Sequence, residues 1–215
     1  QDLGSKVKDI ISDPNNIMFE LKKKEKDIIF WFALVVFMIV IYFTLSSGEF
    51  SFILVLASIT QMASFFIIAQ KVFNYQNSSG LSLNTMISYL IVMVARLSST
   101  LFYSGYLPSD EAGDWFYQLC EVISLILVVV NIIFITTTYK ETSESESEDS
   151  IDYKVLAVPC IILALLVHTS LNKNLLTDVA WSFSMYLEGV AIFPQLHLFQ
   201  KKGGHIESYT SHYVS

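Results

Sequence analysis

Six apolar runs dominate this 215-residue chain: residues 28–46, 50–70, 83–103, 115–138, 155–171 and 181–199. Each is close to the roughly 20 residues that an α-helix needs to cross a bilayer. Hydrophobic residues make up 53% of the chain and charged residues 15%, a composition typical of a polytopic membrane protein and not of a soluble domain. Because a backbone in lipid must satisfy its polar groups internally, each run is predicted to be a transmembrane helix.

Lysines mark alternate ends of these runs. Lys22, Lys23, Lys24 and Lys26 precede the first run, and further lysines follow the second, fourth and sixth runs. Since cytosolic loops carry an excess of Lys and Arg, the N-terminus is predicted to be cytosolic and the first helix to run towards the lumen. The sequon Asn77-Ser78-Ser79 is then cytosolic, so a glycan there would contradict this topology.

The predicted organisation has three parts. Residues 1–26 form a cytosolic segment, 27–47 an extra transmembrane helix, and 50–215 a transmembrane core that contains an acidic cytosolic loop at 139–154. Six of the acidic residues lie at 141–152, where like charge predicts disorder. They account for most of the net charge of −7, so the rest of the chain is nearly neutral and binding to nucleic acid is not predicted. The chain begins with Gln and stops shortly after residue 212, and we expect it to be a fragment of a longer protein.

Nothing in the sequence predicts an enzyme. No nucleophile–base pair, metal cluster or phosphate-binding loop is recognisable, so no cofactor is expected. Cys120 and Cys160 both fall within apolar runs and are predicted to be buried hydrophobic residues rather than disulfide partners or zinc ligands.

Charged residues inside the apolar runs are the candidate functional groups. A carboxylate at membrane depth costs at least ~2.5 kcal/mol, so Glu188 is predicted to face a protein interior or a watery cavity. Arg96 has two interpretations: a residue that snorkels to the lumenal interface, or an anion-binding arginine in a cavity open to the lumen. Glu121 lies in the first turns of its run and is predicted to be solvated.

Two of the runs end in similar sequences. Gln70 closes one run before a turn that contains glycine, and the pair Pro194-Gln195 closes another before Gly203-Gly204. Both runs are predicted to lead from lumen to cytosol, so the match suggests two parallel repeats of three helices. Proline frees a helical carbonyl that a neighbouring amide can satisfy, which gives the Pro-Gln pair a physical role.

Longer motifs resemble those of one family. The stretch WSFSMYLEGVAIFPQL, the later Thr210-Ser211-His212-Tyr213, and Ser79-Gly80-Leu81-Ser82 followed by Arg96 sixteen residues after Gly80 closely resemble the ER lumen protein-retaining receptors, or KDEL/HDEL receptors. The resemblance covers roughly residues 50–215. The extra run at 28–46 is more similar to an N-terminally extended, receptor-related branch.

The resemblance implies an all-α polytopic fold. Its core would have seven helices in two parallel three-helix repeats, similar to PQ-loop and SWEET transporters, with the last helices absent from this chain and one extra N-terminal transmembrane helix. It also implies a receptor that binds C-terminal HDEL/KDEL-type tetrapeptides of lumenal proteins in the acidic Golgi and returns them to the ER. The location would be the ER and Golgi membranes, and the COPI coat would be recruited through a C-terminal tail.

The resemblance also assigns roles to single residues. Arg96 falls on the arginine that pairs with the carboxylate of the cargo, and Glu188 on the glutamate linked to proton-dependent closure. Asp178 falls on an acidic position that contacts cargo, and Trp181 on the tryptophan beside it.

Other positions depart from the family pattern. Gln61 stands where the receptors have a histidine thought to sense pH, and Leu54 where they have an arginine. Leu97 and Ser99 replace a tyrosine and an aspartate. Because a glutamine does not titrate, any pH dependence must come from an acid such as Glu188.

Two other functions stay open at this point. A PQ-loop-like transporter of small solutes would explain the repeat and Pro194-Gln195, although Arg96 is a poor lining for the path of a neutral sugar. A relative that binds no cargo and sorts membrane partners would explain the missing histidine and arginine.

Overall fold

A computed structural model describes residues 29, 31–44, 53–103, 107, 114–143, 151–171 and 174–201. The chain divides into two compact units, Gln1–Ser46 and Ser47–Ser215. The first contains the apolar helix Trp31–Thr44, which corresponds to the predicted extra helix. The lysines at 22–26, most of the acidic loop and the motif at 210–213 lie outside the described residues.

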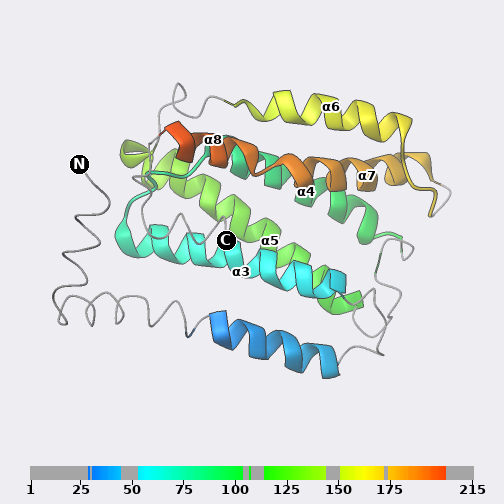
Figure 1. Cartoon of the computed structure of the whole chain (residues 1–215), viewed down its shortest axis with the longest axis horizontal. Helices are drawn as coiled ribbons and strands as arrows, with labels where there is room; N and C mark the ends of the chain where they lie inside the picture. The colour runs from blue at the N-terminus through cyan, green and yellow to red at the C-terminus, as the bar shows by residue number, and fades with distance from the viewer. Residues whose placement is uncertain are drawn as a thin grey trace, which may run out of the picture. The chain divides into compact units, whose positions relative to one another are not determined.

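The described part of the second unit is built from helices (Figure 1). In order they are α3 (Ile53–Tyr75), α4 (Leu83–Thr100), α5 (Asp114–Ile133), the π-helical turn η4 (Phe134–Thr138), the 3₁₀ turn η5 (Lys140–Thr142), α6 (Tyr153–Leu166), α7 (Leu175–Val190) and α8 (Phe193–Lys201). Every predicted apolar run therefore contains a helix. Among the described residues, Ile53–Tyr75 and Asp114–Thr138 are long and apolar enough to cross a membrane, and Trp31–Thr44 and Tyr153–Leu166 are shorter apolar helices.

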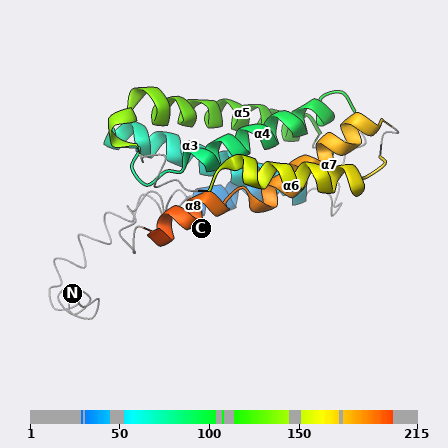
Figure 2. The same ribbon diagram turned by 90° about the horizontal axis from the view of Figure 1, so that it is seen from above.

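Helix α4 lies at the centre of the second unit. It packs against α5 on one side and α7 on the other, while α3 packs on α5 and α6 packs on α7 (Figure 2). Two apolar clusters fill these contacts: one joins Ile68, Leu81 and Met86 to Ile135, and the other joins Met93 to Leu187. Cys120 and Cys160 are buried and unpaired, which confirms the prediction for both.

The turn before α4 is built from the polar residues that predicted it. Gly80 has a φ of 83°, a left-handed conformation that glycine adopts without strain. Ser82 caps α4, since its hydroxyl accepts a 3.1 Å hydrogen bond from the backbone N–H of Thr85. The hydroxyl of Ser78 donates to the carbonyl of Tyr139 at 3.0 Å, which ties this turn to the end of the α5–η4 helix.

The run at 181–199 was predicted as one helix, and the structure corrects this. Helix α7 begins earlier, at Leu175, and stops at Val190, and α8 begins at Phe193. The cause is Pro194, which has no N–H to donate to the carbonyl four residues before it and whose ring disrupts the preceding turn.

Gln195 anchors the start of α8. Its side chain is fully buried, accepts a 2.9 Å hydrogen bond from the N–H of Ser82 and donates a 2.7 Å bond to the carbonyl of Gly80. Its own backbone N–H donates to the hydroxyl of Thr85 at 3.0 Å. The Pro-Gln pair therefore fastens α8 to the start of α4.

Candidate ligand-binding site

Arg96 is the only arginine in the chain, and α4 carries it into the interior of the helical bundle. Its exposed fraction is 5%. Its Nη1 lies 3.3 Å from Oε1 of Glu121 on α5, and its Nη2 is hydrogen-bonded to Oε2 of Glu188 on α7. The snorkelling interpretation is therefore wrong, because the guanidinium is neutralised by carboxylates from two neighbouring helices instead of by water.

Glu121 is fully buried, so the prediction that it is solvated is also wrong. Its Oε1 accepts a 2.9 Å hydrogen bond from the hydroxyl of Ser58 on α3, in addition to the contact with Arg96. The sequence did hold an indication of this burial. Ser124 and Asn131 follow Glu121 at helical spacing, and all three are buried, so they form a polar stripe on the inner face of α5.

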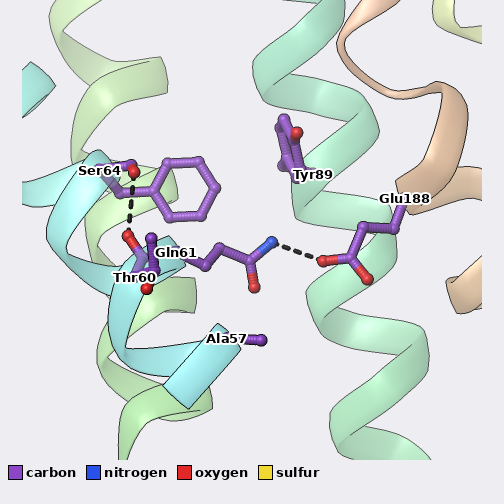
Figure 3. A pocket seen from close by; sticks show the side chains of 7 residues that line it. Ala57, Thr60, Gln61, Ser64, Tyr89 and Glu188 are labelled. Atoms are coloured by element: carbon purple, nitrogen blue, oxygen red, sulfur yellow. Dashed lines mark hydrogen bonds between the residues drawn. The ribbon is translucent and has the colours of Figure 1, made fainter. Parts of the chain in front are cut away.

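Glu188 lies at the boundary between the interior and a pocket. Its side chain is 28% exposed, and its Oε1 accepts a 2.8 Å hydrogen bond from the amide of Gln61 (Figure 3). The pocket has a volume of about 410 Å³. It is lined by Ala57, Thr60, Gln61, Ser64, Phe65, Tyr89 and Glu188.

These contacts form one cluster, which we call the Arg96 cluster: Arg96, Glu121, Glu188, Gln61 and Ser58. A guanidinium has donors at two ends and matches carboxylates well. Glu188 occupies the end that is nearer the pocket, and Glu121 occupies the enclosed end. An anion in the pocket would therefore reach the guanidinium at the end that Glu188 occupies.

Asp178 and Trp181 lie elsewhere on α7 and do not line this pocket. Asp178 is buried, and its carboxylate accepts a 3.1 Å hydrogen bond from the N–H of Leu171. One and two turns further along the same face, Ser182 accepts from the N–H of Thr169 and Tyr186 donates to the carbonyl of Val167. Asp178, Ser182 and Tyr186 therefore hold the segment between α6 and α7 by hydrogen bonds to its backbone. Trp181, which precedes Ser182 in the sequence, is half-buried.

The positions that depart from the family pattern take different roles. Gln61 joins the Arg96 cluster, whereas Leu54 is exposed on α3. Leu97 is buried, and the hydroxyl of Ser99 donates to the carbonyl of Thr177 at 3.0 Å. Gln70 is exposed on α3, so its surroundings differ from those of the buried Gln195 with which the sequence compares it.

Comparison with known proteins agrees with the resemblance. Residues 77–215 match the profile of the family described as ER lumen protein retaining receptor. An ER lumen protein-retaining receptor of Plasmodium falciparum is 30% identical over 162 residues, which cover 74% of this chain and 67% of that protein. ER lumen protein-retaining receptor B of Arabidopsis thaliana is 30% identical over 157 residues (72% and 67%), and the receptor of Entamoeba histolytica is 27% identical over 158 residues (74% and 68%). This chain, with its buried arginine, its paired carboxylates and its apolar helices, belongs to the ER lumen protein-retaining receptor family, a family of membrane receptors and not of enzymes.

Proposed function

We propose that this protein binds the C-terminal carboxylate of ER retention tetrapeptides through Arg96 and returns its cargo from the Golgi to the ER. The ligand enters the pocket beside Glu188, and its carboxylate takes the place of the Glu188 carboxylate on the guanidinium. The family resemblance also assigns Asp178 and Trp181 to contacts with the side chains of the tetrapeptide. These contacts are part of the proposal, although neither residue lines the pocket beside Glu188. Recruitment of the COPI coat and the ER and Golgi location are part of the same proposal.

One observation carries this proposal: the only arginine of the chain is buried and is paired with a carboxylate that is partly exposed in a pocket. Capture of a terminal carboxylate by a cationic pocket is a known mode of peptide recognition. A guanidinium binds a carboxylate more strongly than it binds a neutral oxygen acceptor, which supports a ligand with a carboxylate over the neutral substrate of a PQ-loop-like transporter.

The test uses labelled peptides and the purified full-length protein. A peptide that ends in HDEL with a free carboxylate, and the same peptide with an amidated end, are titrated at several pH values from about 5 to 7. We expect the free carboxylate to bind and the amide to fail. Arg96→Ala should abolish binding. Arg96→Lys keeps the charge but supplies a single donor group, so binding should be weakened and not abolished.

Thermal unfolding of each variant shows whether the fold is retained. Equal binding of the amidated peptide, or no binding at any pH by a folded protein, would contradict the proposal. In the second case, uptake of solutes by liposomes that contain the protein would test the transporter alternative.

A further inference from the structure

The two carboxylates on Arg96 differ in their access to the pocket. The side chain of Glu121 is 0% exposed and is held by Ser58 on α3, within the packing of α3, α4 and α5. Glu188 lines the pocket and is held by Gln61. A ligand in the pocket therefore meets Glu188, while Glu121 stays enclosed.

The charges of the cluster do not balance. One guanidinium faces two carboxylates, so the formal charge of the Arg96 cluster is +1 − 2 = −1. When a ligand carboxylate takes the place of Glu188 on the guanidinium, the side chain of Glu188 remains in the pocket lining. The site therefore gains one negative charge while Glu121 stays on Arg96. Charges interact strongly in a protein interior because the surroundings screen them less than water does.

We propose that Glu121 is a specificity-determining residue of this receptor: a resident counter-ion that stays on Arg96 while ligand carboxylates exchange with Glu188, and whose charge lowers the affinity of the site for anions. This inference rests on the proposed function of Arg96. The negative charge of Glu121 repels the carboxylate of a ligand beside Arg96, and this repulsion favours release of the ligand.

Substitutions of Glu121 can separate the effect of its negative charge from the effect of its size and hydrogen bonds. Glu121→Gln keeps the length of the side chain and an oxygen that accepts from Ser58 and from Nη1 of Arg96, but removes the negative charge. Glu121→Met removes the charge in a second way with similar volume. Because removing one partner of a buried ion pair destabilises a fold, this variant counts only where thermal unfolding shows that it is folded. Glu141→Gln is the matched control, because Glu141 is exposed in η5.

The experiment is a titration of the full-length protein and these variants with the labelled HDEL peptide at one pH, with thermal unfolding as the check on folding. We expect Glu121→Gln and Glu121→Met to bind about tenfold more tightly or better, a gain of about 1.4 kcal/mol, and Glu141→Gln to match the wild type. A purely structural role for Glu121 predicts a loss of affinity and not a gain.

The outcomes separate the inference from the function beneath it. If the wild type binds through Arg96 and both Glu121 variants, correctly folded, bind no more tightly, the inference is overturned and the proposed function stands. If neither the wild type nor any folded variant binds the peptide, the proposed function fails and the inference fails with it.

Discussion

The side-chain amide of Gln61 donates a 2.8 Å hydrogen bond to the carboxylate of Glu188, although the two residues are 127 positions apart in the sequence. The bond connects α3 to α7 across the pocket (Figure 3). It fixes one oxygen of Glu188 so that the other meets Arg96. Because an amide does not titrate, Gln61 itself adds no pH dependence to this contact.

Replacing Gln61 by histidine should add a pH dependence to ligand binding. A histidine changes charge between about pH 5 and 8, and its positive form would cancel the net negative charge of the Arg96 cluster. We expect the ratio of HDEL-peptide affinities at about pH 5.5 and 7.5 to rise roughly tenfold above that of the wild type, with tighter binding at the acidic end. Gln61→Leu is the control that removes the amide without adding a titrating group. Equal pH dependence in the two variants would refute this prediction.

Replacing Gln195 by leucine should destabilise the fold. The variant removes the buried hydrogen bonds of Gln195 to the N–H of Ser82 and to the carbonyl of Gly80, and loss of a buried hydrogen-bond partner costs about 1–3 kcal/mol. We expect a loss of about 2–4 kcal/mol in the free energy of unfolding. This loss should appear as a lower unfolding temperature in detergent. Gln70→Leu is the matched control, since Gln70 is exposed, and it should unfold as the wild type does. The same loss in both variants would show that burial of Gln195 is not the cause.

Variants of Asp178 should separate its role as an acceptor from its charge. Asp178→Ala removes the oxygen that accepts from the N–H of Leu171 and is expected to cost about 1–3 kcal/mol of stability. Asp178→Asn keeps an oxygen at that position and should retain most of the stability of the wild type. The measurement is thermal unfolding of both variants without ligand. If both lose the same stability, the negative charge, and not the hydrogen bond, holds the segment between α6 and α7.

Local features of the sequence predicted local features of the structure. The apolar runs predicted helices, and the glycine and serines at 78–82 predicted the turn before α4. Pro194 predicted a freed helical carbonyl within one helix over 181–199. The sequence did not show that α7 would stop at Val190 or that Gln195 would bond to a turn 115 residues away.

The charged residues mark the limit of prediction from sequence. Glu121 sits near one end of its apolar run, where an exposed and a buried acid look alike along the chain. Its burial depends on which face of α5 meets α4, and its partner Arg96 lies on another helix. The two interpretations of Arg96 could be separated only when its carboxylate partners were known.

The sequence by itself determined the family, the helices and the candidate residues Arg96 and Glu188, because length, hydropathy and motif spacing are properties of the chain alone. Only the tertiary structure decided that Glu121, Gln61 and Ser58 join them. The physical reason is that a charge inside a membrane protein must be neutralised by side chains from neighbouring helices. Which side chains do so depends on how the helices pack, and no local pattern encodes that packing.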